Sequence, residues 1–180
     1  STSADDLTEP ELNPIVDEAI VRWQNTGLLS EQQILLLDQL SFEISDLSGT
    51  LLGLSSGNMI YIDLNAAGYG WFVDLTPDDD SEFSETNDVF VALTDSDAFG
   101  KIDLLTVVMH EIGHVLGFNH DDSVNQDIMD ETLDTGIRLV TETETTITDE
   151  TQEISLDMTN QFYFMFPGMV TNIFKHYNLN

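Results

Sequence analysis

The spacing of hydrophobic and polar residues predicts a helix near the beginning of the chain. Apolar residues recur at helical spacing from Ile15 to Trp23. Asn13 and Pro14 form a typical helix start, with asparagine as the N-cap and proline at the first helical position. Gly27 favours a left-handed turn that ends the helix.

A short helix and several strands are predicted next. Ser30 and Gln33 match a capping box, which predicts a second helix through Leu40. Phe42 and Ile44 then alternate with polar residues, as in a half-buried strand. Further strands are predicted over 59–64, 71–75 and 89–93, with a turn over 55–58 and an acidic loop over 76–88.

The most apolar segment runs from Leu104 to Leu116 and is hydrophobic on most sides. A helix with this pattern is buried in the centre of a domain and leaves one narrow face for polar chemistry. Asp103 is placed to cap it. Farther on, the Thr- and Glu-rich residues 141–153 predict an exposed strand or a linker. Residues 162–176 are apolar enough to pack as a terminal helix.

Length and composition set the limits of the fold. The 180 residues, 41% of them apolar, are enough for one domain with a hydrophobic core, with or without an appended segment. The absence of cysteine excludes disulfides and thiolate metal sites. No apolar run reaches the roughly 18 residues that a membrane span needs.

Charge restricts the partners. The chain carries 34 acidic residues against 4 Lys and Arg, a formal net charge of −30. Nucleic acid and anionic membranes are polyanions, so neither is expected as a partner. A strongly acidic surface is typical of solvated proteins in salty extracellular surroundings, and it also favours divalent cations. We therefore expect a secreted, extracellular protein.

The segment HEIGHVLGFNH, residues 110–120, indicates the chemistry. On a helix, His110 and His114 lie one turn apart, so both rings point to the same side and can share one metal ion. Glu111 is rotated off this pair toward the space beside the metal, where it can move a proton. Gly117 lets the chain turn sharply, so that His120 can return as a third nitrogen ligand.

Three histidines with an open fourth position are typical of catalytic zinc. A simpler interpretation treats the histidines as polar residues on an ordinary helix. A bare HExxH motif has a real false-positive rate, but Gly117 and His120 at the matching positions make coincidence a poor explanation.

The motif resembles the signature of the metzincin zinc endopeptidases, HExxHxxGxxH followed by a turn that contains methionine. Here DIMDETL places Met129 nine residues after His120. The resemblance implies that Met129 forms a hydrophobic floor beneath the metal, and that Asp121 ties the zinc turn to the methionine turn, as in the adamalysin-like branch. Some branches have a tyrosine two residues after the methionine; this chain has Glu131, so oxyanion stabilisation would rest on zinc.

Residues 12–138 look like matrixin-type domains embedded in large secreted bacterial proteins. The resemblance implies an α+β, zincin-like fold: a twisted, mostly parallel sheet with an antiparallel edge strand, a backing helix, a metal-bearing active-site helix and a C-terminal helix. The edge strand would bind an extended protein or peptide substrate by strand addition. This divides the chain into a polar leader (1–11), a catalytic domain (12–138) and a Thr/Glu-rich segment with an apolar helix packed on the same domain (139–180).

Two acidic segments are candidates for calcium. The loop that contains Asp78, Asp79, Asp80 and Glu82 gathers oxygen ligands densely. Residues 95–103 mimic a cation loop in part but lack acids at two ligand positions, and their last residue is better explained as a helix cap. Solvated surface charge explains both segments equally simply. Calcium is therefore a second candidate cofactor beside one catalytic Zn²⁺.

Together these patterns predict a zinc-dependent endopeptidase that hydrolyses peptide bonds in extended protein segments. His110, His114 and His120 bind the metal, and Glu111 is general base and then general acid. Two alternatives stay open: a non-catalytic zinc- or calcium-binding adhesion or structural module of a larger extracellular protein, and a protease kept for self-processing. The intact Glu111 argues against the first, because a structural zinc site does not need that carboxylate.

Overall fold

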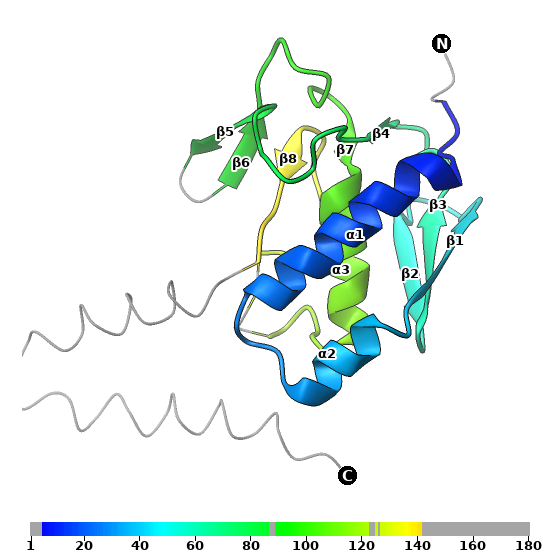
Figure 1. The fold of residues 1–180 in the computed structure, drawn as a ribbon. Helices are drawn as coiled ribbons and strands as arrows, with labels where there is room; N and C mark the ends of the chain where they lie inside the picture. Colours follow the sequence, from blue (N-terminus) through cyan, green and yellow to red (C-terminus); the bar gives the residue numbers. More distant parts are fainter. Residues whose placement is uncertain (1–4, 87–88, 123–124, 126, 142–180) are drawn as a thin grey trace, which may run out of the picture. The chain divides into compact units, whose positions relative to one another are not determined.

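The computed structural model describes residues 5–86, 89–122, 125 and 127–141 (Figure 1). Its helices are α1 (Glu9–Asn25), α2 (Glu31–Leu37) and α3 (Leu104–Val115). Its strands are β1 (Ser41–Ser45), β2 (Gly53–Ser56), β3 (Met59–Asp63), β4 (Trp71–Phe72), β5 (Phe83–Thr86), β6 (Val89–Ala92), β7 (Ile102–Asp103) and β8 (Ile137–Arg138). The α+β class is confirmed, and no helix in the described ranges has the length and apolar character to cross a membrane. The predicted C-terminal helix lies outside the described residues, and the domain boundaries stay a prediction.

α1 begins earlier than predicted because Thr8 caps it. The backbone N–H and the hydroxyl of Thr8 both donate to Glu11 Oε2, at 2.9 and 2.6 Å. This capping interaction sets the start of the helix, and Pro14 lies inside it. The predicted start at Asn13 is therefore wrong. The capping box predicted for the second helix is confirmed, since Ser30 caps α2 and pairs with Gln33.

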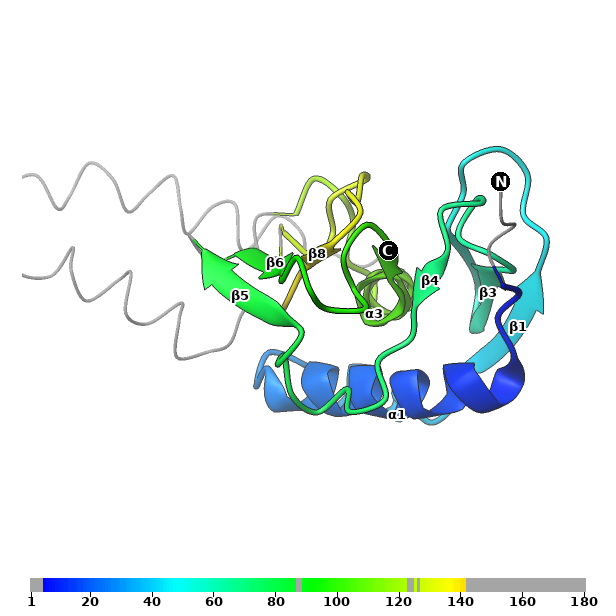
Figure 2. The same cartoon turned by 90° about the horizontal axis from the view of Figure 1, so that it is seen from above.

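α3 lies at the centre of the described fold, as its apolar sequence predicts. Figure 2 shows it almost end-on, with β3 to one side, β6 and β8 to the other, and α1 crossing the view below it. Trp23 of α1 is fully buried, and its indole N–H donates to the Met109 carbonyl oxygen at 3.0 Å. The core around this contact includes Ile15, Ala19, Ile60, Ile62, Leu105, Val108 and Ile112.

The strands form three small sheets with mixed pairing. In the first, β1 is parallel to β3 and β2 is antiparallel to β3, which places β2 at the edge. β4 pairs with β7 in parallel, and β5, β6 and β8 form an antiparallel group. The antiparallel edge strand implied by the resemblance is thus present as β2.

Two strands fall in segments where the sequence predicts a turn or a loop. β2 includes Ser55 and Ser56, and the turn is limited to Gly57 and Asn58. β5 lies inside the predicted acidic loop, whereas the strand predicted over 71–75 is only two residues long. The polar residues of β2 and β5 carry little local signal, because their pairing depends on the neighbouring strand rather than on strand propensity.

A buried arginine joins the acidic loop to the beginning of α3. Arg138 has 0% exposure. Its Nη2 donates to Asp74 at 2.8 Å and to Asp103 at 2.9 Å, and its Nε donates to Asp103 at 3.1 Å. Its Nη1 donates to Asp80 at 2.8 Å. The guanidinium group is thus surrounded by three carboxylates, two from the segment around the acidic loop and one from the beginning of α3.

Asp103 has a second role as the N-cap of α3, as predicted. Its Oδ2 accepts hydrogen bonds from the backbone N–H and the hydroxyl of Thr106, at 3.1 and 2.7 Å. The guanidinium carbon of Arg138 also lies 4.4 Å from the centre of the Phe83 ring, a cation–π geometry. Arg138 therefore holds the first turn of the helix that carries the histidine motif.

We predict that Arg138→Met lowers the free energy of unfolding by about 3–5 kcal/mol, because it leaves buried carboxylates without their counter-charge. Urea unfolding measures this change. Arg22→Met is the matched control, since Arg22 binds the same Asp80 from a partly exposed position and should cost only about 1 kcal/mol. Equal losses in the two variants would contradict the central role of Arg138.

Candidate metal centre

The rings of His110 and His114 project from the same side of α3, as their spacing predicts. Their centroids are 4.6 Å apart. His110 Nδ1 lies 2.9 Å from the Ile128 carbonyl oxygen, and His114 Nδ1 lies 3.1 Å from the Phe118 carbonyl oxygen. A carbonyl can only accept, so each Nδ1 carries the proton and each Nε2 keeps a free lone pair for a metal.

Gly117 takes the chain from α3 toward the third histidine. Its φ of +93° is in the left-handed region that favours glycine, and no atom stands within 4 Å of the place where a Cβ would be. Its N–H donates to the His114 carbonyl oxygen, and the next N–H, of Phe118, donates to the Gly113 carbonyl oxygen. These two bonds form a Schellman motif, which ends the helix sharply and lets His120 return to it.

The three histidines converge on one point. Their ligating nitrogens all lie within 4.8 Å of one another, and His120 Nε2 is 3.3 Å from His110 Nε2. Zn–N bonds of about 2.0–2.1 Å in a tetrahedron place two nitrogens about 3.3–3.4 Å apart, so the spacing of His110 and His120 fits zinc. Burial lowers the pKa of His110 and of His114, which keeps their rings neutral and able to bind a metal.

Glu111 lies between the histidines and the edge strand. Its side chain is only 6% exposed, and it accepts hydrogen bonds from the hydroxyl and the backbone N–H of Ser55 in β2. Gly53 makes room for it, since a Cβ there would stand 2.6 Å from Glu111 Cγ and Oε1. Burial raises the pKa of Glu111 to about 7, against the lowering effect of the Ser55 hydrogen bonds.

Comparison with protein families agrees with this arrangement. The matrixin family model matches residues 62–154, which is more than half of the chain and includes all three histidines. The chain belongs to the matrixin family. No curated protein and no solved structure matches it. Membership in this family makes the chain a zinc metallopeptidase domain at the family level, and the histidine cluster fits the zinc site.

The methionine turn of this matrixin lies directly below the metal-bearing helix. Met129 is fully buried, and a Cβ on Gly113 of α3 would stand 2.5 Å from its sulfur. The Met129 side chain therefore occupies the space that Gly113 leaves open, on the side of α3 that packs against Trp23. Its position agrees with a hydrophobic floor, and that role stays a prediction.

Asp121 and the acidic loop are not brought into this centre. Asp121 is exposed, and no hydrogen bond or ion pair joins it to the described residues of the methionine turn. In the loop, Asp80 binds Arg138 and Arg22, at 2.8 and 3.1 Å. Asp79 accepts from the backbone N–H of Ser81.

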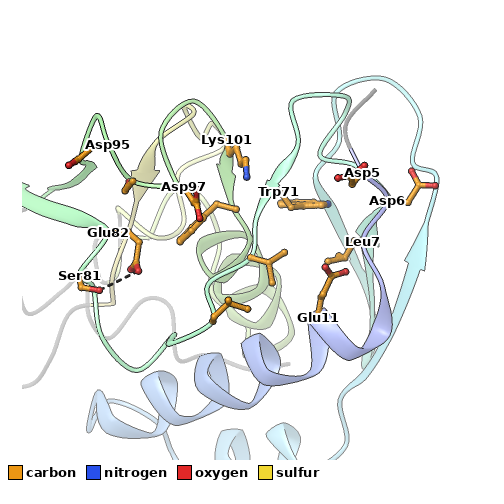
Figure 3. A pocket seen from close by; sticks show the side chains of 14 residues that line it. Asp5, Asp6, Leu7, Glu11, Trp71, Ser81, Glu82, Asp95, Asp97 and Lys101 are labelled. Atoms are coloured by element: carbon orange, nitrogen blue, oxygen red, sulfur yellow. Dashed lines mark hydrogen bonds between the residues drawn. The ribbon is translucent and has the colours of Figure 1, made fainter. Parts of the chain in front are cut away.

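Figure 3 shows the Ser81 hydroxyl donating a hydrogen bond to Glu82 beside a cavity of about 580 Å³, which Asp95 and Asp97 also line. Within the described ranges, the three histidines are the one group of three or more His, Asp or Glu side chains close enough together to hold a metal ion. The acids of this loop therefore do not form a converging ligand set. Calcium binding by Asp78 and its neighbours stays a prediction that this arrangement does not support.

Several residues of the site carry little signal in the sequence. Gly53 and Ser55 reach Glu111 only because β2 lies beside α3. Arg138 binds Asp103 at the beginning of α3 although the two residues are far apart in the sequence. The glycine in the stretch LLGLSS, residues 51–56, is the one local hint, because glycine in a strand often marks a close approach.

We predict that the matrixin domain binds one zinc ion per chain, and that His120→Ala weakens zinc binding by about 100-fold or more, since it removes a direct ligand. Competition with a chromophoric chelator measures the affinity. His176→Ala is the matched control, because it removes the fourth histidine of the chain, which is not in the motif. Equal zinc affinity of His120→Ala and the wild type would refute the assignment of the third ligand.

Proposed function

We propose that this matrixin is a zinc-dependent endopeptidase that hydrolyses peptide bonds in extended segments of protein substrates. The observation that carries the proposal is the placement of Glu111. Its buried carboxylate lies beside three converging histidines and against an edge strand. A proton-transfer group, a metal-binding group and a peptide-binding edge therefore meet at one place.

The chemistry divides between the metal and the protein. Bound zinc acts as a Lewis acid toward the substrate carbonyl and makes water more acidic. Glu111 accepts a proton from the attacking water and returns it to the leaving amine. With its pKa raised to about 7, its acid and base forms are both accessible near neutral pH, as this double role requires.

The position of β2 favours the binding of an extended substrate. It is the edge strand of its sheet, and the Ser55 N–H is directed at Glu111, so the unpaired edge faces the histidines. A cleft of about 830 Å³ runs along this edge. Leu51, Leu54 and Tyr69 line it and are 47%, 47% and 62% exposed. Their apolar surfaces are suited to contact substrate side chains while main-chain groups pair with the strand.

The buried carboxylate also argues against a purely structural zinc module. Taking Glu111 out of water is unfavourable for its charged form, and the raised pKa is the sign of that cost. A closed structural site has no use for such a group. Secretion remains part of the proposal and is supported by the formal charge of −30. Membership in a larger extracellular polypeptide also remains part of it, and its support is the resemblance to matrixin-type domains embedded in large secreted proteins.

Glu111→Gln should keep stoichiometric zinc and lose peptidase activity by at least about 100-fold, because the amide cannot accept the proton. Cleavage of a mixed peptide library, read by mass spectrometry, measures activity and reveals specificity. The comparison needs zinc-loaded protein for both forms. Undiminished cleavage by Glu111→Gln would rule out the proposed role, and no cleavage by the zinc-loaded wild type would favour the non-catalytic module.

Gly53→Ala should reduce kcat while zinc affinity stays near that of the wild type. The added Cβ would displace Glu111, whereas the Nδ1 atoms of His110 and His114 keep their carbonyl partners. Ser56→Ala, on the same strand and exposed, is the control for the small change in side-chain volume. A Gly53→Ala enzyme with wild-type kcat would show that the position of Glu111 against β2 is not required.

A further inference from the structure

His120 is the least supported of the three histidines. His110 and His114 are fixed by the helix and by backbone carbonyls. His120 comes from the loop after Gly117, and its side chain is 36% exposed. A loop histidine that rotates freely would lose conformational entropy on binding a metal, so an orienting contact is valuable there.

That contact is made by a carboxylate of the methionine turn. His120 Nε2 faces His110 Nε2 at 3.3 Å, so its Nδ1 points away from the metal position. Glu131 Oε1 lies 3.4 Å from this Nδ1. When Nε2 binds a metal, Nδ1 carries the proton, and the Glu131 carboxylate stands beside this N–H as an acceptor.

We propose that Glu131 is a positioning residue for the third zinc ligand, holding His120 by accepting its Nδ1–H and so linking the zinc turn to the methionine turn. This inference rests on the zinc site of the proposed function. It gives Glu131 the linking role that the sequence resemblance assigns to Asp121, which is exposed and makes no such bond among the described residues.

The methionine turn would then orient two of the three ligands. The Ile128 carbonyl oxygen fixes His110, and Glu131 fixes His120, while Met129 between them is buried under α3. A carboxylate acceptor sets the tautomer of a zinc-bound histidine and makes it a stronger ligand. Its charge also makes the hydrogen bond stronger than one to a neutral acceptor.

The exposure of Glu131 separates this role from a structural one. Its side chain is 74% exposed, and exposed ion pairs contribute little to folding. Removing the carboxylate should therefore weaken zinc binding while the zinc-free protein keeps its stability. A contact that only stabilises the fold would instead lower the stability of the zinc-free protein and leave zinc binding unchanged.

The test measures zinc affinity by chelator competition for the full chain and three variants. Glu131→Ala should weaken zinc binding by about 10- to 100-fold. Glu131→Gln should lose less, because its amide oxygen still accepts the Nδ1–H without the charge. Asp134→Asn, which removes an exposed acid of the same cleft that makes no contact with a histidine ring, should bind zinc like the wild type.

Two further readouts complete the test. Urea unfolding of the zinc-free proteins should give the same midpoint for Glu131→Ala and the wild type. In the zinc-loaded protein, the His120 Nδ1–H signal in NMR spectra should exchange with water faster in Glu131→Ala. Zinc affinity of Glu131→Ala equal to that of Asp134→Asn would overturn the proposal, as would a matching loss of zinc-free stability. A wild type that binds no zinc would instead remove the proposed function itself.

Discussion

The metal centre depends on the fixed position of α3, and a buried ion pair fixes the beginning of that helix. Asp103 caps the first turn and at the same time binds Arg138 through both carboxylate oxygens. Burial alone would lower the pKa of Arg138, but Asp103, together with Asp80 and Asp74, outweighs it and raises the pKa above its ordinary value. The guanidinium group therefore stays charged inside the protein. In a chain with a net charge of −30, one of only 4 cations is used for this purpose.

The other end of α3 is fixed by backbone geometry. The Schellman motif at Gly117 ends the helix within one residue and sets the direction in which the chain leaves it. The carbonyl that orients His114 belongs to Phe118, directly after this turn, and the Phe118 ring stacks on the buried Trp23. The turn that ends the helix thus also orients His114 and contributes to the packing of the core. The same turn directs the chain toward His120.

The parts of the site that depend on local sequence were predictable. Helical spacing gives the placement of His110 and His114, the glycine at 117 gives the turn, and Asp103 is recognisable as a cap. The error in the predicted start of α1 has a local cause as well. Thr8 and Glu11 form the capping interaction at the beginning of the helix, and Asn13 and Pro14 lie inside it. Both signals are present in the sequence, and only the hydrogen bonds of the folded chain decide between them.

The supporting residues could not be predicted in this way, because their contacts join distant segments. Arg138 reaches Asp74 and Asp103 across the fold, and Ser55 meets Glu111 through the docking of β2 on α3. The last two residues of β2, Ser55 and Ser56, belong to a segment whose sequence resembles a turn. Glu131 has a partner only because two separate turns approach each other.

The central claim is that three histidines hold one zinc ion in the cleft beside Glu111. Anomalous diffraction at the zinc absorption edge, from crystals of zinc-loaded protein, tests it most directly. We predict one strong peak at about 2.0–2.1 Å from the Nε2 atoms of His110, His114 and His120. No peak at this position, or zinc held by the acidic loop around Asp80 instead, would show that the three histidines are not the zinc site.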